Sequence, residues 1–209
     1  KLFASECDIH LTKDGKVVVY HDDYYLGNTC FKDATYAELC AKGTLANGEK
    51  LPLLEEFIDV VLEGGCTQLW IDVKTLGDEA GGNAEASRTG IAAAQIVHEK
   101  RAKNFVGFIV GRLAIRDKVI PAVRSAWPVS YGAAAYEPGD FIARDIPWAN
   151  MKLADFGLDT KRAKNFPENK VRLSLWQIDT DEQMQWYQGI RSDVYGITNY
   201  PLRMMDKLG

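Results

Sequence analysis

Two acidic residues near the start of the chain are spaced so that a strand would point both side chains to one face. They are Glu6 and Asp8, which flank Cys7 in the run Ser5–Ile9, and alternate side chains of a strand share a face. Two carboxylates directed into a protein interior repel each other unless a hard cation such as Mg²⁺ or Ca²⁺ binds their oxygens. The alternative is a solvent-facing polar edge, since this triplet is also typical of exposed strands.

A second charged pair follows an apolar run, Leu69–Val73. Asp72 lies at the end of this run, and Lys74 has the same strand parity. Asp72 is therefore a candidate third oxygen ligand, and the Lys74 ammonium is a candidate partner for a phosphate oxygen. A structural Asp–Lys ion pair would explain the same two residues.

The chain has three histidines. His21 follows the β-rich run Lys16–Tyr20 and precedes two aspartates, a setting that favours a protonated imidazole and a role as general acid, although a structural histidine is the alternative. His10 shares the strand parity of the first carboxylate pair, so it could line the same site, but the sequence gives it no specific role. His98 lies in a helical pattern and is predicted to be at the surface.

Alternating strands and helices must position these residues. Apolar, β-rich runs predict seven strands, at Phe3–Ile9, Leu69–Val73, Phe105–Val110, Val129–Ala135, Met151–Phe156, Arg172–Ile178 and Val194–Thr198. Helical periodicity predicts helices at Leu53–Glu63, Ala84–Arg101, Ile115–Ala126 and Asp181–Gly189. The turn signal Thr12–Gly15 predicts a hairpin-like excursion that returns His21 to the end of the first strand.

The alternation indicates a parallel sheet and an α/β fold, and we expect a TIM-type (β/α)8 barrel that lacks its first strand in this chain. An open doubly wound sheet is the alternative, but no glycine-rich phosphate loop follows any predicted strand. We find no linker or repeat, so the expectation is one barrel domain over residues 1–209, with its N-terminal part missing.

Composition narrows the partners. The 209 residues are 46% hydrophobic, with a net charge of -4 and no basic block, so we expect a small or zwitterionic molecule as partner and no nucleic acid. No apolar run is long enough for a transmembrane segment. The four cysteines show no paired C-x-x-C spacing, so buried or free thiols are expected. Compartment and oligomeric state stay open, with a periplasmic or secreted location favoured over a cytoplasmic one.

Read in order, these motifs resemble the glycerophosphodiester phosphodiesterase family. The signature consists of Glu6-x-Asp8, the stretch from Leu11 to Asp22, and Asp72-x-Lys74. Further similarities cover nearly the whole chain; they are Asp33–Leu39 as a turn and helix, Leu51–Glu56 as a helix entry, Leu175–Asp179 as the seventh strand and Gly196–Pro201 as the eighth.

The resemblance implies a metal-dependent hydrolase that acts on a small-molecule phosphodiester and releases glycerol 3-phosphate and an alcohol. It implies Glu6, Asp8 and Asp72 as ligands of Mg²⁺ or Ca²⁺, and His21 as one of two acid/base histidines. It also implies Lys74 as a phosphate-side cation in the catalytic and substrate-binding set, and Trp176 as a wall of the substrate pocket, for which barrel packing is the alternative.

Several residues depart from the family pattern. The family's His-Arg pair and Glu-Asn-Thr motif do not occur before Glu6, so the chain as given is expected to be nearly inactive. Asp72 replaces the more usual Glu, and this residue and the Thr198–Pro201 ending also resemble sphingomyelinase D enzymes. Two alternatives therefore stay open, namely a sphingomyelinase D-like phospholipid phosphodiesterase and a non-catalytic barrel that binds a polyol phosphate.

Overall fold

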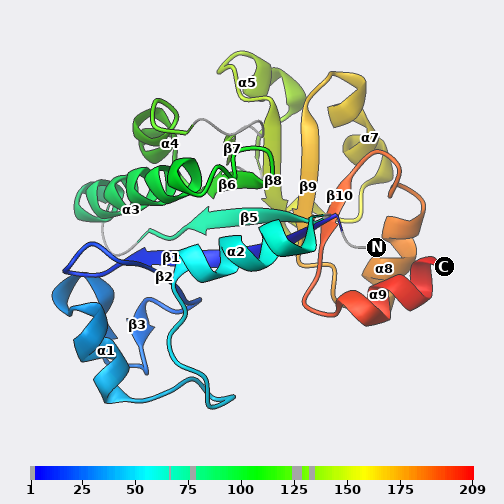
Figure 1. Ribbon diagram of the computed structural model, residues 1–209. Helices are drawn as coiled ribbons and strands as arrows, with labels where there is room; N and C mark the ends of the chain where they lie inside the picture. The colour runs from blue at the N-terminus through cyan, green and yellow to red at the C-terminus, as the bar shows by residue number, and fades with distance from the viewer. Residues whose placement is uncertain (1–2, 66, 76–78, 124–128, 132–134) are drawn as a thin grey trace. The chain divides into compact units, whose positions relative to one another are not determined.

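The computed structural model describes residues 3–65, 67–75, 79–123, 129–131 and 135–209 (Figure 1). The chain divides into two compact units, Lys1–Val129 and Ser130–Gly209. Each combines parallel strands with helices, as the alternating sequence pattern predicts.

Four neighbouring strands form the centre of the first unit, in the order β6-β5-β1-β2. Strands β1 (Ala4–Leu11), β5 (Gln68–Val73) and β6 (Val106–Val110) run parallel, and β2 (Val17–Val19) pairs antiparallel with β1. The register sets Asp8 opposite Asp72. The two predicted acidic motifs are thus neighbours across one strand pair.

Alternation along these strands separates an apolar face from the acidic one. Cys7 and Ile9 are buried, and they pack with buried apolar residues of β5 and β6 into one hydrophobic core. Helices α2 (Leu54–Gly64), α3 (Glu79–Glu99) and α4 (Leu113–Val119) contribute the other side of this core. Burial of Cys7 confirms the predicted parity, because it fixes Glu6 and Asp8 on the opposite face.

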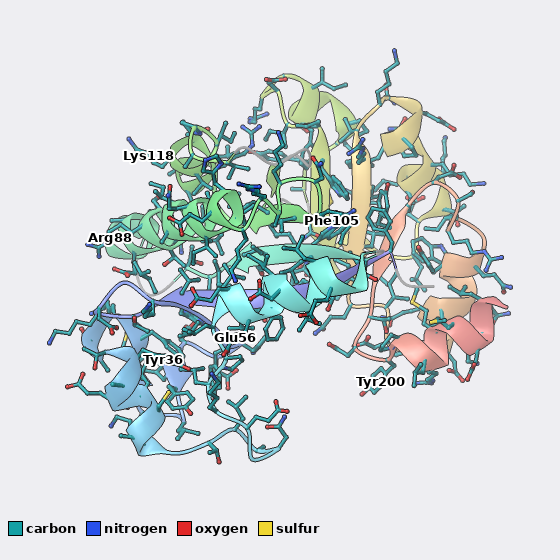
Figure 2. All side chains as sticks on the ribbon, in the orientation of Figure 1. Tyr36, Glu56, Arg88, Phe105, Lys118 and Tyr200 are labelled. Carbon is teal, nitrogen blue, oxygen red and sulfur yellow. The ribbon has the colours of Figure 1, made fainter. Side chains whose placement is uncertain are left out.

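The segment between β2 and α2 folds as a small excursion with its own core. It contains β3 (Tyr24–Tyr25), β4 (Thr29–Cys30), a 3₁₀ turn (Phe31–Asp33) and α1 (Tyr36–Lys42). Its buried apolar residues are Tyr25, Phe31, Ala34, Leu39 and Leu51, which pack with Val18 of β2. Tyr36, labelled in Figure 2, donates a hydrogen bond from its hydroxyl to the Leu51 carbonyl at 2.8 Å, which closes the segment on itself.

The second unit has the strand order β10-β9-β8-β7, all parallel. These strands are β7 (Val129–Tyr131), β8 (Trp148–Lys152), β9 (Arg172–Trp176) and β10 (Tyr195–Ile197). The helices of this unit are α5 (Pro138–Ile142), α6 (Leu153–Phe156), α7 (Thr160–Glu168), α8 (Asp181–Gln188) and α9 (Pro201–Leu208). Trp176 therefore stands at the carboxyl end of β9.

The strand predicted at Met151–Phe156 is wrong in its position. The strand covers Trp148–Lys152, and the next four residues form α6. Leu153 and Phe156 are spaced one helical turn apart and are both buried, so the apolar run suits a helix as well as a strand.

Two other predicted elements reach beyond what the structure describes or assigns. The helix predicted at Ile115–Ala126 ends at Val119, and its last three residues lie outside the described residues. The strand predicted at Val129–Ala135 is present over Val129–Tyr131, and residues 132–134 lie outside the described part. Within the described residues, no helix is both long and apolar enough to cross a membrane.

Candidate metal centre

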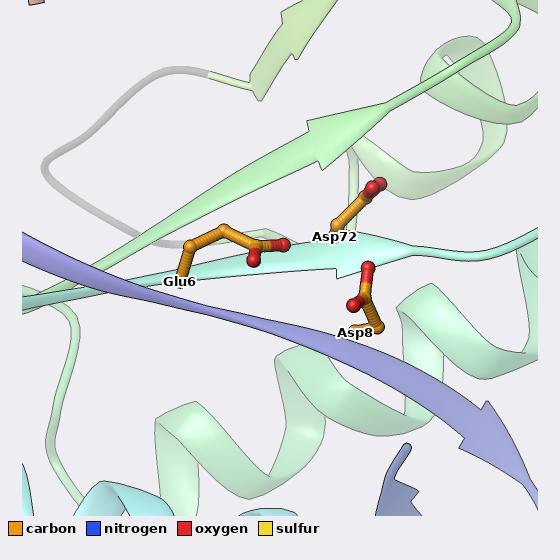
Figure 3. Close-up of side chains that lie close together, drawn as sticks. All are labelled: Glu6, Asp8 and Asp72. Atoms are coloured by element: carbon orange, nitrogen blue, oxygen red, sulfur yellow. The ribbon is translucent and has the colours of Figure 1, made fainter. Parts of the chain in front are cut away.

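Three carboxylates converge on one face of the strand pair β1 and β5, Glu6 from the middle of the paired stretch and Asp8 and Asp72 nearer its carboxyl end. Glu6, Asp8 and Asp72 each offer one oxygen, and these oxygens all lie within 4.8 Å of one another. Figure 3 shows the three side chains close together beside β1 and β5. The proximity follows from strand parity within β1 and from the parallel register that pairs Asp8 with Asp72.

Lys74 joins this cluster from the residue that follows β5. Its Nζ lies 2.7 Å from Asp8 Oδ1 and 3.5 Å from Asp72 Oδ2. Burial opposes the charge of this ammonium, but the attraction of Asp72 and the hydrogen bond to Asp8 outweigh burial, and the pKa of Lys74 is raised. The ion pair that the sequence left as an alternative is thus present, and it lies inside the carboxylate cluster.

The cluster carries more negative charge than one ammonium offsets. Solvent reaches the Glu6 side chain, but many protein atoms surround its carboxyl group. This desolvation, followed by the repulsion of Asp8 and Asp72, raises the pKa of Glu6 to about 8. Burial likewise raises the pKa of Asp72 to about 6, against the opposing attraction of Lys74. A divalent cation would relieve the repulsion that shifts both groups.

The residues present fit a hard cation. All three are carboxylates, which are the ligands that Mg²⁺ and Ca²⁺ prefer, and their oxygens come within reach of one ion. The site is also asymmetric, because Lys74 lies against Asp8 and Asp72 and not against Glu6 in the ion pairs above.

The β1–β2 hairpin brings the chain back along β1, so that His21 follows β2 near the strand residues that carry the cluster. Val19 pairs with Ile9, and the Tyr20 amide donates to the Asp8 carbonyl at 3.0 Å. The His21 side chain is exposed, and its Nδ1 lies 2.7 Å from Asp22 Oδ1. The charge of His21 contributes to lowering the pKa of Asp72, which places the imidazole within electrostatic reach of the carboxylates. The predicted excursion is confirmed as a hairpin.

His10 is the site-proximal residue for which sequence reasoning found no role. Its side chain is 2% exposed and stacks on Phe31, with ring centroids 4.4 Å apart and an interplanar angle of 8°. Strand parity signalled its position, but the aromatic partner comes from the excursion, 21 residues further on by number, and only the folded chain brings the two together.

Trp176 belongs to the second unit, as does the lysine beside it. The Lys152 ammonium lies 5.6 Å from the centre of the Trp176 ring, and the two residues are register partners on β8 and β9. A half-buried indole with a cation on its face differs from a packed core tryptophan. The sequence gave no signal for Lys152.

Parallel strands that alternate with helices, with a carboxylate cluster on one face of two neighbouring strands, define an α/β barrel-type protein with a candidate site for a hard cation. The chain belongs to the Glycerophosphoryl diester phosphodiesterase family, whose model matches residues 4–200. Family membership assigns the chain to the phosphoric diester hydrolases that act on glycerophosphodiesters, and its fold is the TIM-type barrel of that family, as expected.

Solved structures agree with this fold. A glycerophosphodiester phosphodiesterase from Parabacteroides distasonis is 23% identical, with a TM-score of 0.79 over 99% of this chain and 83% of the other. An Oleispira antarctica phosphodiesterase, solved with its product sn-glycerol-3-phosphate, is 17% identical, with a TM-score of 0.79 over 99% and 85%. A glycerophosphodiester phosphodiesterase from Thermotoga maritima is 19% identical, with a TM-score of 0.67 over 98% and 84%. A comparison with curated protein sequences gives no match.

Proposed function

We propose that the protein hydrolyses a glycerophosphodiester to glycerol 3-phosphate and an alcohol with the help of Mg²⁺ or Ca²⁺ bound by Glu6, Asp8 and Asp72. Water supplies the oxygen that joins phosphorus, the bond from phosphorus to the alcohol oxygen breaks, and a proton is delivered to that oxygen. The convergence of three carboxylate oxygens within 4.8 Å is the observation that carries the proposal. When bound, the cation supplies Lewis acidity to a phosphate oxygen.

Lys74 binds the phosphate side of the substrate. Its ammonium is held by two carboxylates and keeps its charge, because its pKa is raised. A fixed cation at this position offsets the negative charge that develops on phosphate oxygens during displacement. The residue thereby acts on substrate and also screens Asp8 from Asp72.

His21 delivers the proton to the leaving alcohol. Asp22 accepts a hydrogen bond from Nδ1–H of His21, so Nε2 is the ring nitrogen left for proton transfer. The exposed side chain is within electrostatic reach of Asp72, which suits a group that meets substrate at the mouth of a site. Loss of such an acid removes about 10²- to 10⁴-fold in rate.

Trp176 is proposed as a wall for the glycerol or alcohol part of the substrate. Its half-buried indole offers a flat apolar surface on which a polyol can stack. The Lys152 ammonium near the ring adds positive charge, which favours an anionic over a cationic group at this surface.

The test is hydrolysis of glycerophosphocholine and glycerophosphoethanolamine by the full-length gene product with Mg²⁺ or Ca²⁺. Release of glycerol 3-phosphate from either ester supports the proposal, and the Asp72→Asn variant should abolish the release. No release with either ion, together with tight binding of glycerol phosphate, would assign a binding role instead. Choline release from sphingomyelin or lysophosphatidylcholine, with a cyclic phosphate product, would assign sphingomyelinase D chemistry.

A further inference from the structure

One face of the neighbouring strands β8 and β9 carries polar and aromatic side chains (Figure 1). Asn150 and Lys152 lie on either side of the buried Met151 in β8, so they share the face opposite to it. The parallel register sets Asn150 beside Ser174 and Lys152 beside Trp176. The Asn150 amide is thus on the same face as the proposed substrate wall, two residues nearer the amino ends of the strands.

A chain of two hydrogen bonds fixes the orientation of the Asn150 amide. The Trp148 indole N–H, which can only donate, donates to Ser174 Oγ at 3.2 Å. Ser174 Oγ lies 2.7 Å from Asn150 Oδ1, the usual length of a bond from a hydroxyl to an oxygen, and 3.3 Å from the Ala149 carbonyl oxygen. The one hydrogen of the Ser174 hydroxyl is therefore donated to Asn150 Oδ1.

The other end of the same amide, Nδ2, carries two N–H donors. Nδ2 donates to no atom in the part of the chain that the structure describes. Asn150 is only 6% exposed, and buried donors of folded proteins are almost always paired with an acceptor. Since Oδ1 is held by Ser174, the amide cannot turn Nδ2 away from this face. A bound molecule that brings an oxygen atom here would supply the missing acceptor.

Lys152 adds a second donor group to this face. Its side chain is exposed, and its ammonium lies 5.6 Å from the centre of the Trp176 ring. Asn150 Nδ2 and the Lys152 ammonium both donate and neither accepts, so together they bind oxygen atoms. A quaternary ammonium group has no acceptor, is repelled by Lys152, and finds the Trp176 ring, which would otherwise attract it, already next to a cation. The surface therefore favours hydroxyl oxygens over choline.

We propose that Asn150 and Lys152 bind hydroxyl oxygens of the alcohol part of the substrate while its carbon chain lies on Trp176. The preferred substrates are then glycerophosphodiesters whose alcohol is a polyol. The inference rests on the proposed function, because it places the alcohol against Trp176, and it adds the chemical class of that alcohol. Asn150 and Lys152 are specificity-determining residues in this account and take no part in bond breaking.

The test compares the binding of glycerophosphoglycerol and glycerophosphocholine to the full-length gene product by calorimetry in EDTA, in which metal-dependent hydrolysis does not occur. We expect glycerophosphoglycerol to bind about 10-fold more tightly, the order of effect of one or two hydrogen bonds. Asn150→Asp has the same shape and keeps the acceptor for Ser174, but it replaces the Nδ2 donors by an oxygen. This variant should lose the preference.

Two further variants complete the comparison. Lys152→Met, at an exposed position, should bind glycerophosphocholine more tightly, because a repelling charge has gone from the Trp176 ring. Asn169→Asp makes the same chemical change as Asn150→Asp at an exposed position just after α7, and it should leave both affinities unchanged. If Asn150→Asp does not fold, Lys152→Met decides the outcome.

Equal affinities for the two esters in the unsubstituted protein would overturn the inference, as would an undiminished preference in Asn150→Asp and Lys152→Met. Failure of the proposed function has a different result. A protein that shows the binding preference in EDTA but hydrolyses neither ester with Mg²⁺ or Ca²⁺ would contradict the hydrolase function and support the role of Asn150 and Lys152 in binding. Hydrolysis of both esters without a binding preference would do the reverse.

Discussion

At the scale of single residues, the ammonium of Lys74 and a bound cation would share the same carboxylates. Lys74 lies 2.7 Å from Asp8, one of the proposed ligands. A positive charge at that distance repels a second cation even when both are favoured by the carboxylates. The lysine is thus expected to weaken ion binding while it helps the reaction.

Lys74→Met should therefore separate ion affinity from activity. We expect the variant to bind Mg²⁺ or Ca²⁺ at least as tightly as the unsubstituted protein, because a competing charge has gone, and to lose most of its activity, because a phosphate contact has gone. Calorimetry and the glycerophosphodiester assay measure the two effects. Lys100→Met, which removes the ion pair with Asp59, is the control and should change neither. Weaker ion binding in Lys74→Met would show that the ammonium orients the ligands and does not compete.

At the scale of elements, β10 packs closely against α8 and α9 of the second unit. A Cβ added at Gly196 would come within 2.7 Å of the Tyr187 ring, 2.9 Å of Ile178 and 3.0 Å of Met204. The last two atoms are ends of flexible side chains, but Tyr187 is held by a hydrogen bond from its hydroxyl to the Val194 carbonyl at 2.8 Å. The strand can approach its helices only because this position has no side chain.

Gly196→Val is expected to destabilise the protein by about 1 to 3 kcal/mol, the usual cost of a substitution that overpacks a core. Urea denaturation measures the change in free energy of unfolding. The control is Gly189→Ala, at which the nearest atom to the new Cβ is 3.5 Å away, an ordinary contact, and the backbone is helical. A Gly196 variant as stable as this control would mean that β10 moves away from α8 and α9 at no measurable cost.

A pH-dependent link joins the same two helices. Asp181, in the first turn of α8, accepts from Lys207 and Arg203 of α9, and these hydrogen bonds lower the pKa of Asp181 below its ordinary value of 3.8. Because the folded pKa of Asp181 lies below the unfolded one, its interactions with Lys207 and Arg203 stabilise the protein above about pH 4. This stabilisation is lost as the pH falls through the folded pKa. The exposed position makes the contribution small.

Asp181→Asn should therefore be less stable than the unsubstituted protein at pH 6, and the difference should vanish in acid below the folded pKa of Asp181. Denaturant midpoints for both proteins across this range measure it. Glu182→Gln, one residue further along α8, is the control and should show no such convergence. A stability gap for Asp181→Asn that persists in acid would assign the effect to side-chain packing and not to charge.

At the scale of the whole chain, local patterns predicted the strands and carboxylates better than they predicted packing partners. Parity placed Glu6 and Asp8 on one face, and burial of Cys7 confirms it. The pairing of Asp8 with Asp72 needed the parallel topology, which the strand and helix alternation supplied. The stack of His10 on Phe31 could not be predicted, because the sequence pattern around either residue does not indicate its contact with the other.

The sequence pattern did not predict some of the helices, and the cause is again that packing partners stabilise them. Helices α5 and α6 are only one to two turns long, and α7 is mostly polar, so none gives a sustained apolar period. Helix α9 begins at a proline and buries mainly Met204. Contacts with neighbouring elements stabilise such short helices more than propensity does.

Ion binding should also be visible as stability of the whole molecule. A ligand that binds only the folded state stabilises it by about 2.7 kcal/mol at a free concentration of 100 times its Kd. We expect Mg²⁺ or Ca²⁺ to raise the melting temperature and EDTA to reverse the change. In Asp72→Asn the melting temperature should no longer respond. A response of the same size in that variant would locate the ion elsewhere.

The convergence of Glu6, Asp8 and Asp72 on one hard cation is tested most directly by titrating the metal-free full-length gene product with Mg²⁺ and with Ca²⁺ in a calorimeter. We predict one binding site in the unsubstituted protein. Glu6→Gln and Asp72→Asn should each weaken it by at least the roughly 10- to 100-fold seen when a mere supporting contact of a metal ligand is removed, while Asp59→Asn leaves it unchanged. Equal affinities in all four proteins would contradict the account.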